Sequence, residues 1–120
     1  MDGNFPEVPS NVNLWKGLFS DSLPVFLSAA DRNASGRAPD VSYLHVDCDL
    51  YSSTRTIFEL MAHRIVAGTV LHFDEFFNYP GWRRGEYMAF QELLASRGLE
   101  FEYVGYVMNH EQVAVRITSV

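Results

Sequence analysis

The chain has 120 residues, of which 48% are hydrophobic and 20% charged, a composition that predicts one globular domain and excludes a disordered chain. The formal net charge of −6 argues against a surface for nucleic acid or for an anionic membrane, because both need clustered lysine and arginine. The single cysteine, Cys48, excludes an internal disulfide, and no apolar run long enough to span a membrane occurs, so we expect a cytoplasmic protein.

The first forty residues are expected to contain an arm, a strand and a short helix. Residues 1–11 are polar and proline-rich, and we expect an extended N-terminal arm. Val12–Leu18 alternates apolar and polar residues, which predicts a short strand. Asp21 or Ser22 is expected to cap a helix that carries a proline in its first turn, and residues 31–40 form a predicted loop.

Two strand–helix units are expected next. Val41–Val46 is a strand candidate, and Ser52 or Ser53 is positioned to cap the helix that follows. Apolar residues recur through that helix at helical spacing: Ile57, Leu60, Met61 and Ile65. Thr69–Phe73 is a second β-rich run, and an aromatic loop at 76–85 follows it.

The C-terminal third predicts a helix and a hairpin. Glu86–Arg97 has one apolar face and Gly98 as its stop signal. Glu100–Val107 and Gln112–Ile117 are two strands whose short connection fits an antiparallel hairpin. Because strands and helices alternate, we expect an α/β domain with a mostly parallel sheet, closed by that hairpin and occupying residues 1–120 as one domain.

Acidic residues end both central strands of this predicted sheet. Asp47 and Asp49 follow the first strand, and Asp74 and Glu75 follow the second. Ligands of open parallel sheets bind beyond the carboxyl ends of the strands, and neighbouring strand ends lie about 5 Å apart. Carboxylates that close repel each other unless a cation lies between them, and Mg²⁺ prefers oxygen ligands. The pattern therefore predicts a metal site.

Some residues near these acids have a structural interpretation as well. Asp47 taken alone could be a helix cap, and Asp49 is the better candidate to cap the following turn. His45 and His72 lie within apolar strands, where a hydrogen-bonded core histidine is the expected role. His110 in the hairpin connection is equally consistent with a solvated loop and with a site contact. The aromatic loop is either a lid over an organic substrate or packing.

Several stretches together resemble the macrocin O-methyltransferase family (TylF/MycF type). They are KGLFSDSLP, HVDCDLYSST, GTVLHFDEFFNYPGW, EYMAFQELL and FEYVGYVMNHEQVAVRI, and the resemblance runs from about Val12 to Ile117. Members of this family are class I enzymes that use S-adenosylmethionine to methylate sugar hydroxyls of natural products. The resemblance therefore implies a Rossmann-like methyltransferase sheet, S-adenosylmethionine and Mg²⁺ as cofactors, and a glycosylated small molecule as substrate.

The resemblance also implies roles for the acidic residues. Family members hold Mg²⁺ with an aspartate after the fourth strand and an acidic pair after the fifth, positions that match Asp47, Asp74 and Glu75. The aspartate matched by Asp47 is also the proposed general base that takes the proton of the sugar hydroxyl. Glu75 stands where relatives often carry aspartate.

The chain departs from the family at the cofactor site. The family binds its cofactor with a glycine-rich loop after the first strand, and no G-x-G occurs here, so no cofactor-binding residue can be assigned. The family's sheet has the strand order 3-2-1-4-5-7-6. The residues that match correspond to the C-terminal portion of that sheet, and strands 1 and 2 are lacking. Val41–Val46 would then have an unpaired edge, which predicts either pairing with Val12–Leu18 or self-association as a homo-oligomer. A non-catalytic remnant of such a domain is the alternative function.

A strand that ends in D-x-D also occurs in phosphohydrolases of the haloacid-dehalogenase type. There Asp47 would be the nucleophile and Asp49 the acid. Tyr51 stands where that type carries threonine or valine, and the only lysine, Lys16, lies far upstream of the place where that type carries a basic residue. We therefore prefer the methyltransferase interpretation.

Overall fold

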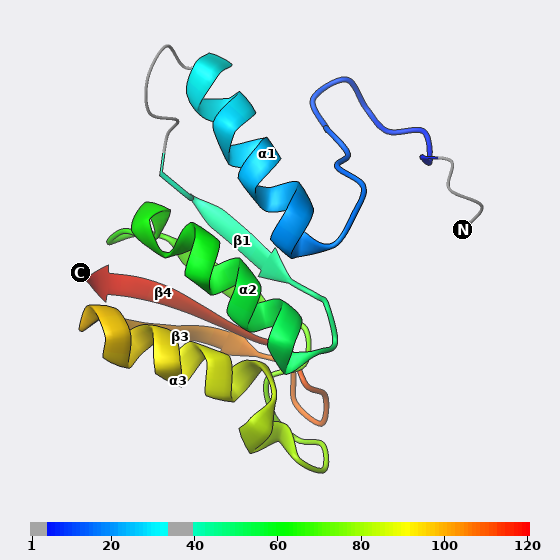
Figure 1. Ribbon diagram of the computed structural model, residues 1–120. Helices are drawn as coiled ribbons and strands as arrows, with labels where there is room; N and C mark the ends of the chain where they lie inside the picture. Colours follow the sequence, from blue (N-terminus) through cyan, green and yellow to red (C-terminus); the bar gives the residue numbers. More distant parts are fainter. Residues whose placement is uncertain (1–4, 34–39) are drawn as a thin grey trace.

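The computed structural model describes residues 5–33 and 40–120 (Figure 1). Helices and strands alternate along this part of the chain: α1 (Phe19–Asn33), β1 (Tyr43–Val46), α2 (Tyr51–Met61), η1 (Ala62–Arg64), β2 (Val70–Phe73), η2 (Trp82–Arg84), α3 (Glu86–Arg97), β3 (Glu100–Tyr106) and β4 (Val113–Ser119). None of the helices in the described ranges has the length and apolar character needed to cross a membrane.

The four strands form one mixed sheet in the order β1-β2-β4-β3. β1 and β2 are parallel, with Val46 opposite Phe73, and β4 pairs antiparallel with both β2 and β3. The expected α/β sheet with a final antiparallel hairpin is therefore confirmed, but the sheet is mixed rather than mostly parallel, because only the β1–β2 pair is parallel. This order matches strands 4-5-7-6 of the sheet that the family resemblance implied.

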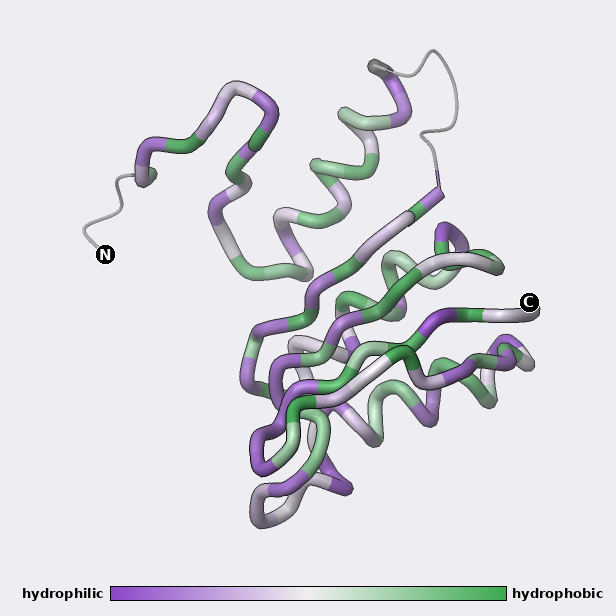
Figure 2. The backbone as a smooth tube through the Cα atoms, turned by 180° about the vertical axis from the view of Figure 1, so that it is seen from behind, coloured by the Kyte–Doolittle hydropathy of each residue, from purple (hydrophilic) through white to green (hydrophobic). Residues whose placement is uncertain are grey.

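Helices α2 and α3 pack side by side over one face of the sheet (Figure 1). Strand residues that point toward them are buried and form the core with the apolar faces of the two helices: Val46, Leu71, Phe73, Val113, Val115, Ile117, Ile57, Phe58, Phe90 and Leu93. The opposite face carries the exposed side chains of His45, Glu102 and Arg116. Figure 2 shows the backbone from behind, with hydrophilic and hydrophobic residues alternating along the strands. The sheet is therefore covered on one face only within the described residues.

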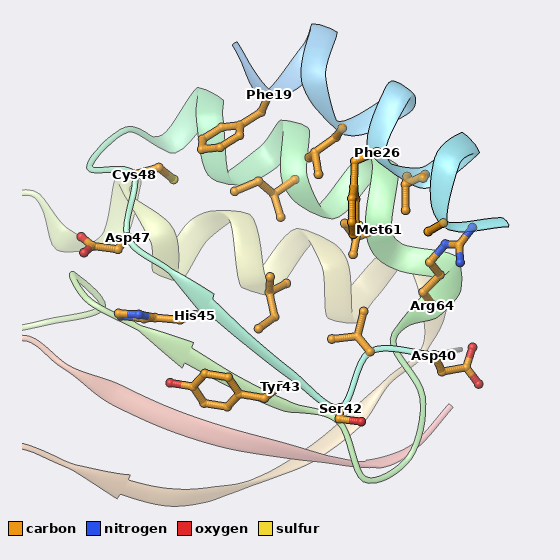
Figure 3. A pocket seen from close by; sticks show the side chains of 16 residues that line it. Phe19, Phe26, Asp40, Ser42, Tyr43, His45, Asp47, Cys48, Met61 and Arg64 are labelled. Carbon is orange, nitrogen blue, oxygen red and sulfur yellow. The ribbon is translucent and has the colours of Figure 1, made fainter. Parts of the chain in front are cut away.

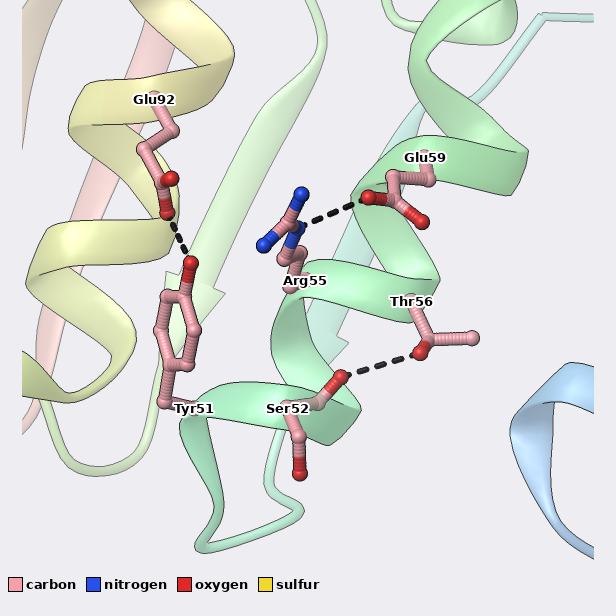
Figure 4. A network of polar contacts seen from close by, with 6 residues as sticks. All are labelled: Tyr51, Ser52, Arg55, Thr56, Glu59 and Glu92. Carbon is pink, nitrogen blue, oxygen red and sulfur yellow. Dashed lines mark hydrogen bonds and ion pairs between the residues drawn. The ribbon is translucent and has the colours of Figure 1, made fainter.

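Polar contacts on the exposed side of the helices join α2 to α3 (Figure 4). The Tyr51 hydroxyl donates to the Glu92 carboxylate, across the two helices. Arg55 pairs with Glu59 one turn along α2, at 2.8 Å between Nε and Oε1. Because these groups are exposed, they contribute less to the packing than the buried aromatic residues beneath them.

The predicted strand Val12–Leu18 is wrong. Residues 5–18 contain no helix or strand and are all exposed, although Trp15 makes an edge contact with Phe26 of α1 at 5.6 Å between ring centroids. Apolar alternation forms a strand only when a partner supplies the ladder of hydrogen bonds, and no described strand lies beside this segment. The expectation that it pairs with the Val41–Val46 strand is therefore wrong as well.

Helix α1 is longer than predicted. It begins at Phe19, because the amides of Asp21 and Ser22 both donate to the Leu18 carbonyl oxygen, and it continues to Asn33, into the predicted loop. The remaining loop residues 34–39 lie outside the described residues.

The predicted caps of α2 are also wrong. Leu50 is the N-cap residue, without a side-chain cap, and the Thr54 hydroxyl instead donates to the Leu50 carbonyl oxygen at 3.1 Å. Asp49 therefore does not cap this helix. By contrast, α3 has the predicted bounds, and Gly98 ends it with a positive φ of 64°.

Candidate metal and active site

The carboxyl ends of β1 and β2 lie side by side, because the two strands are parallel neighbours in register. Asp47 directly follows β1 and Asp74 directly follows β2. The Asp74 amide donates to the Val46 carbonyl oxygen at 3.0 Å, which ties the two strand ends together. The expected convergence of the two acidic strand ends is present in the structure.

Two sets of possible metal ligands share Asp74. In the first, single ligand atoms of Asp49, Asp74 and Glu75 all lie within 4.8 Å of one another. In the second, His45, Asp47 and Asp74 meet the same limit. The three predicted ligands are thus all at this cluster, and Asp74 links Asp47 on one side to Glu75 on the other.

Asp49 reaches the cluster through a strained backbone. Its φ is +64°, a left-handed conformation that aspartate adopts more readily than most residues. This turn brings the Asp49 carboxylate to that of Glu75, where the two share a hydrogen bond. Asp49, which the sequence pattern assigned to a helix cap, is therefore part of the acidic cluster.

The crowding of these carboxylates changes their pKa values. A hydrogen bond with Asp74 is the largest cause that raises the pKa of Asp47, followed by desolvation and the negative charge of Asp74. The pKa of Glu75 is raised to about 7, mainly by its hydrogen bond with Asp49, then by desolvation and by neighbouring charges. Both pKa values are therefore raised by the crowding of carboxylates, which a bound divalent ion would offset.

Glu86 lies behind this cluster and was missed in the sequence. Its side chain is buried, with a relative exposure of 1%, and its Oε1 accepts the Glu75 backbone N–H at 2.9 Å. Within the described ranges its Oε2 has no hydrogen-bond partner. Burial raises the pKa of Glu86 to about 7. A possible signal was its position four residues before Phe90, on the apolar face of α3.

The strand histidines lie differently from the expected core positions. His45 is exposed, and its ring stacks on that of His72 at 4.3 Å between centroids and an interplanar angle of 15°. His72 is half-buried and shares a hydrogen bond of 2.6 Å between its Nδ1 and the Tyr43 hydroxyl. Both side chains point to the face that α2 and α3 do not cover, so the prediction of a core histidine is wrong for His45.

The aromatic loop packs into the domain. Phe76 is buried with a relative exposure of 4%, and its ring lies 5.0 Å from that of Phe73. Trp82 makes an edge contact with Tyr87 of α3 at 4.9 Å. Packing is therefore the observed role of Phe76. His110 is exposed and belongs to neither set of ligands found in the described residues.

An apolar groove of about 650 Å³ runs between α1 and β1 (Figure 3). Phe19, Leu23 and Phe26 of α1 line one side, and β1 with Met61 of α2 lines the other. Cys48 is half-buried beside it, and burial raises the pKa of its thiol. The groove ends at Asp47, so an apolar surface adjoins the acidic cluster.

The donors of the cluster fit a divalent cation. Carboxylate oxygens are the ligands that Mg²⁺ prefers, and the buried, unpartnered oxygen of Glu86 adds negative charge nearby. No ion pair in the described part of the chain involves Asp47, Asp49 or Asp74. A cation would therefore reduce the repulsion between these carboxylates.

No family model matches the chain, and no curated protein matches it either. Among solved structures it is similar to the apo structure of CalS11, a TDP-rhamnose 3'-O-methyltransferase of calicheamicin biosynthesis, with a TM-score of 0.60 and 22% identity over 84% of this chain. It is similar to a second crystal structure of CalS11, a calicheamicin methyltransferase, with the same TM-score, identity and coverage of this chain. The chain spans 40% of the first structure's length and 35% of the second's. Its Rossmann-like α/β fold is similar to part of the fold of these two structures.

Proposed function

We propose that the chain forms the metal and acceptor part of a Mg²⁺-dependent O-methyltransferase that methylates a sugar hydroxyl of a natural product. The observation that carries the proposal is that Asp74 lies within 4.8 Å of Asp47 in one ligand set and of Glu75 in the other, where β1 and β2 end. Similarity to a sugar O-methyltransferase fold supports it, as does the apolar groove that adjoins Asp47.

In this proposal Asp47 accepts the proton of the sugar hydroxyl. Asp47 is exposed and can meet a substrate from solvent, whereas Asp74 is half-buried and is held by Gln112, whose Nε2 lies 3.4 Å from Asp74 Oδ1. Asp74 and Glu75, with Asp47, would hold Mg²⁺. When bound, that ion would lower the pKa of a hydroxyl and orient it.

We assign no residue of the chain to S-adenosylmethionine. Neither the sequence nor the described strand–helix turns contain the glycine-rich loop that carries the cofactor in the family. In this proposal the chain supplies the acceptor half of the reaction. The reducing environment suited to a single cysteine makes the cytoplasm the proposed compartment.

A non-catalytic, self-associating form is the alternative, and the outer edge of β1 favours it. The carbonyl oxygens of Ser42 and Val46 accept from the amides of Val70 and Asp74, so the backbone groups of Tyr43 and His45 face the opposite edge, which pairs with no strand of the described residues. An unpaired edge beside an apolar groove can accept a strand of another chain. We propose a second copy as that partner.

Calorimetry with Mg²⁺ and with S-adenosylmethionine tests the proposed function. We expect the chain to bind Mg²⁺ and not the cofactor, which would identify an acceptor half-site. Failure to bind Mg²⁺ would contradict the proposed site and leave the non-catalytic form. Release of phosphate from an aryl phosphate would instead indicate a phosphohydrolase that uses Asp47 and Asp49.

A further inference from the structure

One of the two ligand sets contains a nitrogen atom. A ring nitrogen of His45 lies within 4.8 Å of carboxylate oxygens from Asp47 and Asp74. His45 and Asp47 are two residues apart at the end of one strand, so both project to the same side of β1 (Figure 3). Asp74 completes the set from the neighbouring strand end.

The His45 ring is held in place by its neighbours. It stacks on His72 with an interplanar angle of 15°, directly across the parallel pair. The His72 ring is in turn fixed by the hydrogen bond between its Nδ1 and the Tyr43 hydroxyl. Because the ring is already oriented, it loses little conformational freedom when one of its nitrogens binds an ion. Second-shell partners orient metal-binding histidines in the same way in known metal sites.

The nearby Glu86 carboxylate is an independent indication of a missing positive charge. It is buried, its Oε2 lacks a hydrogen-bond partner among the described residues, and it interacts electrostatically with both Asp74 and Asp47. A buried carboxylate with an unsatisfied oxygen is costly. A cation held by Asp47 and Asp74 would lower that cost.

We propose that His45 is a nitrogen ligand of this site and that the set His45, Asp47 and Asp74 binds a borderline divalent ion of the Co²⁺ to Zn²⁺ type. Imidazole suits such ions, whereas Mg²⁺ takes oxygen ligands and would use carboxylates alone, those of Asp47, Asp74 and Glu75. Because Asp74 belongs to both sets, the two kinds of ion compete. The inference rests on the proposed function for the use of Asp47 and Asp74 and adds the class of ion.

The test compares Co²⁺ and Mg²⁺ binding to the whole chain and to the variant His45→Phe. Phenylalanine keeps an aromatic ring to stack on His72 and removes the nitrogen. The matched control is His63→Phe, in η1 before the amino end of β2 and so at the other end of the sheet from the cluster. Calorimetry measures both affinities, and the visible absorption of bound Co²⁺ reports whether a nitrogen is coordinated.

We expect His45→Phe to weaken Co²⁺ binding by about tenfold or more, with a changed Co²⁺ spectrum, and to leave Mg²⁺ affinity within about twofold. His63→Phe should change neither. Unchanged Co²⁺ affinity and spectrum in His45→Phe would overturn the inference while Mg²⁺ binding kept the proposed function intact. Absence of binding by either ion to the unsubstituted chain would overturn both.

Discussion

The buried Glu86 carboxylate accepts the backbone N–H of Glu75 at 2.9 Å, and this bond joins the first turn of α3 to the end of β2. It fixes the backbone from which the Glu75 side chain reaches Asp49 and Asp74. Glu86 is thus a positioning residue for the cluster. It is also a buried acid whose negative charge destabilises the folded state.

The pH dependence of stability should report the Glu86 charge. Its pKa is raised from 4.5 to about 7 in the folded chain, so the folded state binds its proton more tightly than the unfolded state. The free energy of unfolding should therefore fall as pH rises from about 4.5 through about 7, by an amount on the order of 3 kcal/mol. Urea unfolding with a chelator present, followed across this range, measures the slope.

The variants Glu86→Gln and Glu86→Ala separate the two roles of this residue. Glutamine retains a carbonyl oxygen to accept the Glu75 N–H and removes the charge, so we expect greater stability than the unsubstituted chain at pH 8 and little difference at pH 4. Alanine removes the acceptor and leaves a cavity, and it should destabilise at pH 4 by about 1–3 kcal/mol. Equal pH slopes in Glu86→Gln and the unsubstituted chain would contradict the assignment.

Asp74→Asn should weaken Mg²⁺ binding more than Asp49→Asn. Asp74 belongs to both ligand sets, whereas Asp49 belongs to one, so loss of the Asp74 charge affects every arrangement of the ion. We expect a loss of about tenfold or more for Asp74→Asn, which corresponds to about 1.4 kcal/mol. Titration calorimetry gives both values, and equal losses would mean that the ligands are wrongly assigned.

The sequence predicted the sheet well because each central strand has a partner that its pattern could anticipate. β1, β2 and the hairpin carry β-branched and aromatic runs between clear turns, and α3 ends at a glycine with the required positive φ. The predicted Val12–Leu18 strand was wrong because alternation of apolar and polar residues is a local pattern, whereas a strand also needs a neighbouring strand to pair with.

The acidic cluster was predictable in part for a related reason. Asp47, Asp74 and Glu75 follow strands, so their convergence comes from the topology. Asp49 depends on a left-handed turn, Glu86 on how α3 docks, and His45 on a sheet face left uncovered. Each of these depends on tertiary packing, which periodicity in one sequence does not encode.

The ion pair between the buried Arg64 and the 38% exposed Asp31 side chain should be a main anchor of α1. Arg64 Nη2 lies 2.8 and 2.9 Å from the two Asp31 oxygens, and the Arg64 side chain is 5% exposed. Asp31→Asn leaves a buried guanidinium with a weaker partner, so we expect a loss of about 2–3 kcal/mol in unfolding free energy. The exposed pair of Arg55 and Glu59 is the control, since Arg55→Gln should cost about 0.5 kcal/mol or less. Similar losses of unfolding free energy in Asp31→Asn and Arg55→Gln, measured by urea unfolding, would contradict this difference between the two ion pairs.

Self-association, if it occurs, should involve β1 rather than the other edge strand. β3 also lies at an edge of the sheet, but it carries a register shift between Tyr103 and Gly105 and the charged Glu100 and Glu102, features that discourage pairing. β1 has no such protection, and the apolar groove lies beside it.

Tyr43→Pro tests this edge with little disturbance of the sheet. Tyr43 is the first residue of β1 and its N–H faces away from β2, so proline removes a donor from the open edge and keeps the β1–β2 ladder. We expect sedimentation velocity to show a concentration-dependent dimer for the unsubstituted chain and a monomer for Tyr43→Pro, with similar circular dichroism. Val104→Pro, at the irregular point of β3, is the matched control and should leave the dimer unchanged. A monomer at every concentration of the unsubstituted chain would contradict pairing at β1, and loss of the dimer only in Val104→Pro would place the contact on β3.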